Sequence, residues 1–221
     1  MQIRTTNTFS PNFQAIHIAN AKNYLGNIET NIKLYELNSN KDKSFLKDLP
    51  AKIKMYKLMP DLTPDNYDRW HEMLEYATDK ALSPDRKTLL AVVDNKPCGI
   101  AVFLPGKNKF HLDCICTWPI EYGKKVKLAG TTLFKQMFEI FQDSKADRIQ
   151  LEAITDGPFD TVSKYKNLGF TEWGGRSNQI FMQTTAPKVK KTMKYLDDLI
   201  LTEKIKNSSK ENLNEILDLQ I

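Results

Sequence analysis

The sequence predicts a mixed α/β fold, and two features of its apolar pattern lead to that prediction. Between residues 89 and 118, three mostly apolar runs are separated by turn residues, which is typical of a meander of three strands. These runs are residues 89–93, 98–104 and 110–118. After Pro119 the apolar spacing changes, and helical and strand patterns alternate as far as residue 183. Since such elements bury their apolar faces against one another, we expect a single α/β domain here.

The part of the chain before the meander is less regular. The first thirty residues are polar and show no clear period, so we expect an irregular arm with one short strand at residues 13–18. Residues 32–37 alternate as a half-buried strand does. A short helix is predicted from Asp42 to Pro50, and a longer one begins at Pro64. The longer helix has apolar residues on one face, at Tyr67, Trp70, Met73, Leu74 and Ala77.

After Pro119, the predicted elements follow in the order helix, strand, helix and hairpin. Residues 128–141 form the first helix and residues 148–154 the strand. The second helix opens near Pro158 and ends at Gly169, which suits a C-terminal cap. The hairpin is made of residues 170–173, Gly174-Gly175 as its turn, and residues 179–183.

Beyond Pro187 the sequence predicts a helical tail. Its helix carries an apolar stripe of Val189, Met193, Leu196 and Ile200. A linker at residues 206–210 is followed by a last short helix with Leu213, Ile216 and Leu217. An exposed stripe would cause association, so it packs either on the chain's own core or on a second copy, as a homodimer through the tail. The predicted division is an N-terminal arm at 1–30, a domain at 31–186 and a C-terminal tail at 187–221.

Composition argues against several classes of protein. Of the 221 residues, 27% are charged, and no apolar run approaches the roughly 20 residues that span a bilayer. With no signal-like start, we expect a cytoplasmic protein without a membrane partner. The net charge is +5, but the lysines are mixed with acidic residues, which disfavours nucleic-acid binding. Three cysteines without further ligands at metal spacing predict core side chains and no metal: Cys98, Cys114 and Cys116.

Two segments of the predicted domain carry recognisable motifs. The loop that enters the first helix after the meander reads Lys125-Val126-Lys127-Leu128-Ala129-Gly130-Thr131. The end of the second helix reads Lys164-Tyr165-Lys166-Asn167-Leu168-Gly169-Phe170. Together with the element order from residue 89 to residue 183, these motifs resemble the GNAT superfamily of acyl-CoA-dependent N-acyltransferases. The resemblance implies a twisted, largely antiparallel sheet with helices on both faces.

The resemblance also implies that the chain binds acetyl-CoA. Backbone N–H groups and lysines of the first motif would hold the diphosphate at a helix N-terminus. Leu128 stands where the family usually has its first glycine, and Pro158 stands near a common asparagine. The preceding strand splays from its neighbour in the family, and its main chain would pair with pantetheine. The candidate cofactor-binding residues are Cys116, Thr117, Trp118, Lys125, Val126, Lys127, Leu128, Ala129, Gly130 and Thr131.

Ordinary structural roles remain open for these residues. The first motif is equally consistent with a plain helix start whose lysines face solvent, and Trp118 with a core or rim aromatic.

Catalytic roles follow from the same resemblance. Tyr165 would protonate the departing thiolate, because a phenol can donate a proton and be restored by solvent. An attacking amine must be neutral, so a base or a water path to one is needed. Asp113 is the first candidate and His111, on the same strand face, the second; Glu152 is the third. The alternative is packing for Tyr165 and an ordinary strand position for the other three.

The sequence therefore predicts an N-acetyltransferase that moves an acetyl or other acyl group from acetyl-CoA directly to a primary amine. The acceptor would be a small molecule or a protein amine. The alternative is a non-catalytic GNAT-like module that binds a ligand or a protein. The sequence contains no serine nucleophile elbow and no Gly-x-x-x-x-Gly-Lys phosphate loop.

Overall fold

The computed structural model of the protein describes residues 15–25, 28–107, 109–157, 159–205 and 210–211. Its strands are β1 (Ala15–Leu25), β2 (Ile28–Leu37), β3 (Lys87–Val93), β4 (Lys96–Pro105), β5 (Phe110–Thr117), β6 (Arg148–Ile154), β7 (Thr171–Arg176), β8 (Gln179–Thr185), β9 (Ile200–Lys204) and β10 (Lys210–Glu211). Its helices are α1 (Lys43–Lys52), α2 (Met55–Leu58), α3 (Pro64–Ala81), α4 (Ala129–Gln142), α5 (Thr161–Asn167) and α6 (Ala186–Leu199).

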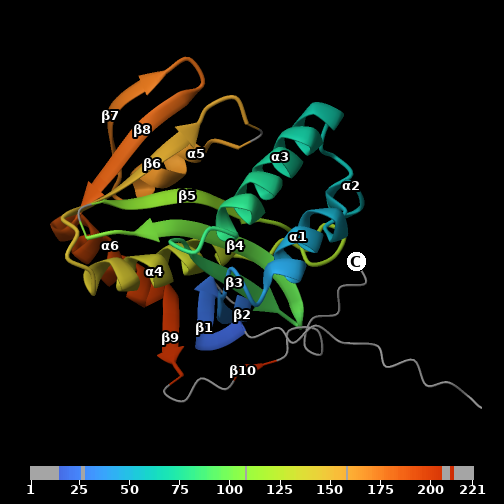
Figure 1. Ribbon diagram of the computed structural model, residues 1–221, viewed down its shortest axis with the longest axis horizontal. Helices are drawn as coiled ribbons and strands as arrows, with labels where there is room; N and C mark the ends of the chain where they lie inside the picture. The colour runs from blue at the N-terminus through green and yellow to red at the C-terminus, as the bar shows by residue number, and fades with distance from the viewer. Residues whose placement is uncertain (1–14, 26–27, 108, 158, 206–209, 212–221) are drawn as a thin grey trace, which may run out of the picture.

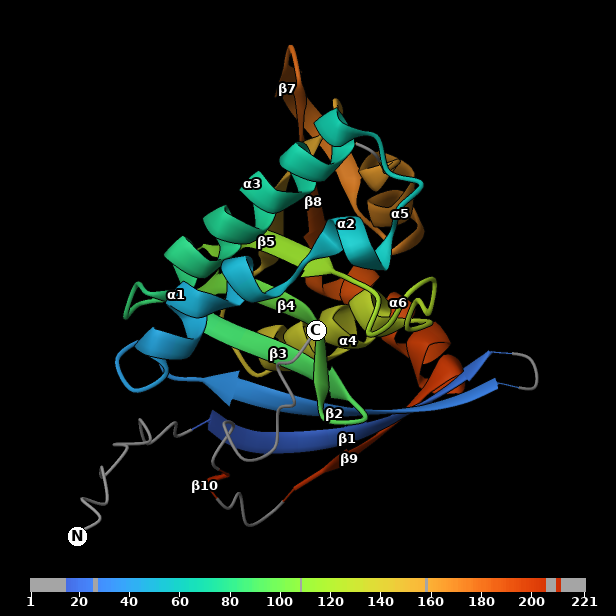
Figure 2. The same ribbon diagram turned by 90° about the vertical axis from the view of Figure 1, so that its right-hand side faces the viewer.

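The strands form one twisted sheet with helices on both faces (Figure 1; Figure 2). The strand order is β10-β1-β2-β3-β4-β5-β6-β8-β7, and β9 pairs with β1 beside this path. β5 and β6 are parallel, whereas the other described pairs are antiparallel. The largely antiparallel mixed sheet that the resemblance implies is therefore confirmed.

The segment at residues 15–25 is a full strand of the sheet, where the sequence predicts an irregular arm with only a short strand at residues 13–18. β1 pairs with β2 along its length and with β9 and β10 on its other edge. Ile16 and Tyr24 are exposed, whereas the buried positions hold small or polar residues: Ala15, His17, Ala19, Ala21 and Asn23. Burial therefore follows the period of a strand while hydrophobicity does not, and this conceals the second half of β1, from residue 19 to residue 25, in the sequence.

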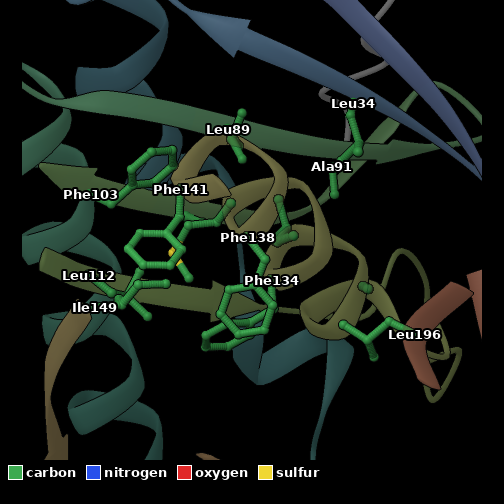
Figure 3. Close-up of a cluster of buried hydrophobic side chains, with 14 of the residues drawn as sticks. Leu34, Leu89, Ala91, Phe103, Leu112, Phe134, Phe138, Phe141, Ile149 and Leu196 are labelled. Atoms are coloured by element: carbon green, nitrogen blue, oxygen red, sulfur yellow. The ribbon is translucent and has the colours of Figure 1, made fainter. Parts of the chain in front are cut away.

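Each face of the sheet carries its own core. On one face, aromatic rings of α4 point at the sheet, as Figure 3 shows for Phe134, Phe138 and Phe141. The ring of Phe141 meets that of Phe110 edge-on, with centroids 5.3 Å apart. On the other face, α1, α2 and α3 cover a second cluster that includes Trp70. Each buried ring stabilises the fold by about 1.5–3 kcal/mol, so the two clusters hold the sheet from both sides.

A β-bulge in β5 decides which core its side chains join. Val102 and Phe103 of β4 pair with Cys114 and Leu112, so Asp113 has no partner in this ladder. The extra residue shifts the alternation of side chains along β5. Leu112 consequently lies in the core under α4, whereas Cys114 lies in the core under α3.

The tail packs on its own chain. The stripe residues Val189, Met193 and Leu196 of α6 are buried in the core under α4. Ile200 is also buried, but it begins β9 instead of extending the helix. The stripe is covered within one chain, so it offers no surface for the homodimer through the tail. The predicted linker and last helix fall mostly on residues 206–209 and 212–221, outside the described residues.

Two smaller predictions need correction. α1 runs past Pro50 to Lys52, because the N–H of Ile53 donates to the Leu49 carbonyl and continues the helix. The final hairpin turns at residues 177–178, and Gly174-Gly175 lie inside β7 next to a bulge, a usual place for strand glycines. The other predicted elements that lie among the described residues are confirmed to within a few residues. None of the described helices is both long and apolar enough to cross a membrane.

Candidate active site

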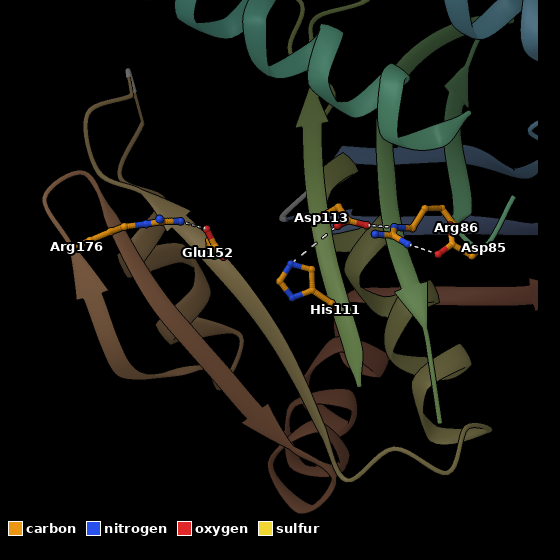
Figure 4. Close-up of polar contacts among 6 residues, drawn as sticks. All are labelled: Asp85, Arg86, His111, Asp113, Glu152 and Arg176. Atoms are coloured by element: carbon orange, nitrogen blue, oxygen red, sulfur yellow. Dashed lines mark hydrogen bonds and ion pairs between the residues drawn. The ribbon is translucent and has the colours of Figure 1, made fainter. Parts of the chain in front are cut away.

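The parallel strands β5 and β6 pair for three residues and then separate. Their ladder begins at Phe110 and Ile149 and ends at Leu112 and Leu151. Each strand continues beyond it, held by its other neighbour, β4 for β5 and β8 for β6. The two strands diverge in Figure 4, as the resemblance implies. The facing edges past the ladder therefore carry backbone N–H and C=O groups that no strand pairing satisfies.

A cavity of about 480 Å³ lies at this opening. It falls within the size range of ligand sites, about 300–1,000 Å³. Tyr165 lines it, and so do most of the predicted cofactor-binding residues: Cys116, Thr117, Val126, Leu128, Ala129, Gly130 and Thr131. The predicted residues Trp118, Lys125 and Lys127 do not line it.

The helix α4 begins at this cavity without a side-chain cap. Leu128, the residue before the helix, has a φ of 61°, in the left-handed region. This conformation costs roughly 1–2 kcal/mol for a residue with a Cβ. No side chain caps the helix, and its first turn holds no acidic residue. The backbone N–H groups of Ala129, Gly130 and Thr131 are therefore placed for an anion, which the helix dipole also favours.

A hydrogen-bond network from β1 holds this helix start. Asn23 is buried, and its Nδ2 donates to Thr132 Oγ1 at 3.0 Å and to the Lys127 carbonyl at 3.3 Å. Thr132 Oγ1 donates in turn to the Leu128 carbonyl at 2.9 Å. These bonds fix the chain on both sides of Leu128, so they stabilise its left-handed conformation.

The ring of Tyr165 forms part of the cavity wall. It lies on α5, whose first turn is capped by Asp160, with Oδ1 accepting from the Ser163 N–H at 3.0 Å. The ring meets that of Phe134 edge-on, with centroids 5.8 Å apart, and lies tilted against that of Phe170, with centroids 6.0 Å apart. Burial raises the pKa of the phenol, so the hydroxyl stays protonated at neutral pH.

Trp118 is placed in the core. Its Nε1 donates to the Pro97 carbonyl at 2.6 Å, and its ring meets that of Trp70 edge-on at 6.2 Å. Trp70 itself lines the cavity from α3. Trp118 therefore supports a wall residue and lies one layer behind the site.

The three candidate bases lie outside the cavity lining, on the strands that flank the opening (Figure 4). Asp113, the bulged residue, accepts from Arg86 Nε at 2.7 Å and is 6% exposed in its side chain. His111 Nε2 lies 4.0 Å from Asp113 Oδ1. Burial lowers the pKa of His111, so its imidazole is neutral at neutral pH. Glu152, on β6, pairs with Arg176 at 3.3 Å.

The structure adds wall residues that the sequence analysis misses. α3 contributes Trp70 and Met73, which reach the opening from the far face of the sheet. α6 contributes Tyr195, Leu196 and Leu199. Helical spacing predicts that Trp70, Met73 and Leu196 lie on buried faces, but no local pattern indicates that these faces meet a cavity.

The described part of the chain shows no group of three His, Cys, Asp or Glu side chains that could hold a metal ion. The three cysteines are free and buried, as core side chains are. Cys114 and Cys116 place their sulfur atoms 3.5 Å apart, on the same side of β5.

Comparison with solved structures assigns the fold. The sequence itself matches no family model and no curated protein. The structure is similar to aminoglycoside 6'-acetyltransferase type Ii, with a TM-score of 0.51 and 15% identity over 69% of this chain and 96% of that one. It is also similar to apo FdhC, described as a nucleotide-linked sugar GNAT. The TM-score is 0.50, and the identity is 14% over 85% of this chain and 97% of that one. The chain, with its splayed β5 and β6, therefore has the fold of the GNAT superfamily.

Proposed function

We propose that the protein transfers an acyl group, acetyl in the simplest case, from acyl-CoA to a primary amine. One observation carries the proposal: the unpaired edges of β5 and β6 and the uncapped start of α4 line the same cavity. The helix start suits a diphosphate, and the strand edges suit the amide groups of a pantetheine arm. Both halves of an acyl-CoA therefore find complementary backbone groups in one place.

The residues around the opening suit direct transfer. Bound acyl-CoA supplies an activated thioester. Backbone groups of β5 and the α4 start orient it, and such positioning supplies a large part of the rate. The amine nitrogen attacks the carbonyl carbon, the carbon–sulfur bond breaks, and the Tyr165 hydroxyl donates its proton to the departing sulfur. The ring of Tyr165 packs against Phe134 and Phe170, and the residue lines the cavity, which supports this role for its hydroxyl.

The attacking amine must also lose a proton, and His111 is our preferred acceptor for it. Asp113 is engaged by Arg86 at 2.7 Å, so its charge is already paired. His111 is neutral, because burial lowers its pKa, and a neutral imidazole can take a proton. Since His111 does not line the cavity, we expect the proton to reach it through water.

Binding of acetyl-CoA is the first test. The full-length protein is titrated with acetyl-CoA by calorimetry and melted with and without it. At 100 times the dissociation constant, the ligand should stabilise the fold by about 2.7 kcal/mol. No heat and no shift of the melting temperature would exclude the proposed function. Binding without transfer to any of a panel of amines would indicate a non-catalytic ligand-binding module.

The role of Tyr165 is tested by removing its hydroxyl alone. Tyr165→Phe keeps the ring and its packing, so acetyl-CoA affinity should be retained. Because general acid catalysis is worth about 10²–10⁴-fold, turnover should fall by at least about 100-fold. A tenfold or smaller effect on turnover, measured with any accepted amine, contradicts this role.

A further inference from the structure

The helix α6, which the sequence presents as a tail, forms one wall of the cavity. Tyr195, Leu196 and Leu199 all line it. Figure 2 shows α5, α6 and the start of α4 converging on one edge of the molecule. The site therefore has a third helical wall besides α4 and α5.

Two contacts place this wall beside the first turns of α4. Lys135 Nζ pairs with Asp197 at 2.9 Å and also donates to the Ile200 carbonyl. Lys135 lies four residues after Thr131, hence on the same face of α4, and Thr131 lines the cavity. The C-terminal half of α6 therefore runs alongside the helix start that we assign to the diphosphate.

A further contact joins the middle of α6 to the end of α5. Thr192 Oγ1 donates to the Leu168 carbonyl at 3.3 Å. α6 thus contacts both α4, through Lys135, and the end of α5, through Leu168, and it lines the cavity between them. Leu196 is fully buried at the base of this wall.

Tyr195 stands at the outer rim of the wall. It lines the cavity and is nevertheless 60% exposed, one of the largest exposed fractions among the described aromatic residues. None of the described ring–ring contacts involves it. A flat aromatic face at the mouth of a ligand site is available for stacking.

We propose that Tyr195 stacks on the adenine base of acyl-CoA, so that α6 binds the nucleotide half of the ligand. This inference rests on the proposed function. With the thioester in the sheet opening near Tyr165 and the diphosphate at the α4 start, the adenosine must leave the groove on the solvent side. Tyr195 and Leu199 both line the cavity from α6, and Tyr195 is exposed to solvent. α6 is then part of the binding site as well as a packing element.

The experiment compares two ligands on three variants. Acetyl-CoA carries the nucleotide, and S-acetylpantetheine lacks it. Tyr195→Leu removes the aromatic face, Tyr195→Phe keeps it, and Tyr56→Leu is a control at an exposed tyrosine outside the cavity. All are full-length chains, checked by melting and titrated by calorimetry. We expect Tyr195→Leu to weaken acetyl-CoA binding by about tenfold or more, as loss of base stacking does, with S-acetylpantetheine unaffected. Tyr195→Phe and Tyr56→Leu should bind both ligands as the unsubstituted protein does.

Other outcomes overturn the inference in distinguishable ways. Unchanged acetyl-CoA affinity in Tyr195→Leu shows that the ring has no part in binding. Equal loss for both ligands shows that the residue shapes the groove without contacting the base. If the unsubstituted protein binds no acetyl-CoA, the proposed function fails first, and this inference fails with it.

Discussion

The helices α3 and α4 pack on β5 from opposite faces, yet their N-termini are built differently. α3 follows Thr63, whose Oγ1 accepts the Asn66 N–H at 3.3 Å. It has proline at its first position and Asp65 in its first turn. α4 follows Leu128 in a left-handed conformation, with no side-chain cap and no acidic residue in its first turn.

This difference separates a helix start that stabilises the fold from one that is left open. At α3, the Thr63 hydroxyl accepts the N–H of Asn66, and the Asp65 carboxylate lies at the positive end of the dipole. At α4, no side chain takes either role, and the helix start faces a cavity. Substitutions at α4 should therefore change ligand binding, and substitutions at α3 should change stability.

The largest effect is expected from Gly130→Val. A Cβ at Gly130 would meet only Thr117 Cγ2, at 3.6 Å, within 4 Å, so the fold should tolerate it. The added methyl groups would keep a diphosphate from the helix start. Loss of two hydrogen bonds to a charged group, at about 1.5–3 kcal/mol each, weakens acetyl-CoA binding by at least about 100-fold. Calorimetry measures the acetyl-CoA affinity and a melting curve measures the stability of the fold. A parallel loss of folding would indicate a packing role for Gly130.

A charge at the same helix start should move stability and binding in opposite directions. Thr131→Glu places a carboxylate in the first turn of α4, where the dipole favours it by about 0.3–1 kcal/mol. The same charge repels a diphosphate, so acetyl-CoA affinity should fall by about tenfold, an electrostatic loss near 1.4 kcal/mol. Thr131→Gln is the neutral control. Equally weak acetyl-CoA binding by Thr131→Gln and Thr131→Glu would show that the shape of the side chain, and not its charge, causes the loss.

Asn23→Ala tests the network that holds the α4 start. It removes the hydrogen bonds to Thr132 and Lys127 and leaves buried groups without partners, which costs about 1–3 kcal/mol of unfolding free energy. Acetyl-CoA affinity should fall less than in Gly130→Val, because the N–H groups remain. The exposed Asn31→Ala on β2 is the matched control. If urea unfolding gives Asn23→Ala and Asn31→Ala the same free energy of unfolding, Asn23 does not stabilise the α4 start.

Thr63→Ala should have the smallest effect and none on binding. Loss of an N-cap hydroxyl costs about 1 kcal/mol of stability. For a chain of this size that lowers the melting temperature by roughly 2–4 °C. Acetyl-CoA affinity should match that of the unsubstituted protein, and a weaker affinity would remove the distinction between the two helix starts.

Most of the sheet can be predicted from the sequence, because apolar residues mark its central strands. Leu89, Leu90 and Ile100 are apolar and buried, so pattern and burial agree there. The part of β1 beyond residue 18 cannot be predicted in this way, since Ala19 and Asn23 face the interior while Tyr24 faces solvent. Its place in the sheet is set by backbone pairing with β2, β9 and β10, which no local pattern records.

The candidate site is predictable where a motif is local. Five of the seven residues of the first motif line the cavity, all but Lys125 and Lys127, and so does Tyr165. The bulge at Asp113 and its ion pair with Arg86 depend on contacts between distant segments, so the sequence gives no sign that this carboxylate is already paired. The position of Tyr195 at the cavity also depends on contacts between distant segments, because the packing of α6 on α4 brings it there.

The most direct test of the central claim is a crystal structure of the full-length protein with acetyl-CoA. The account predicts the diphosphate within hydrogen-bonding distance of the backbone N–H groups of Gly130 and Thr131. It also predicts the pantetheine arm between the separated ends of β5 and β6, with the thioester sulfur near the Tyr165 hydroxyl. Acetyl-CoA bound at another surface, with the α4 start left to water, would contradict it.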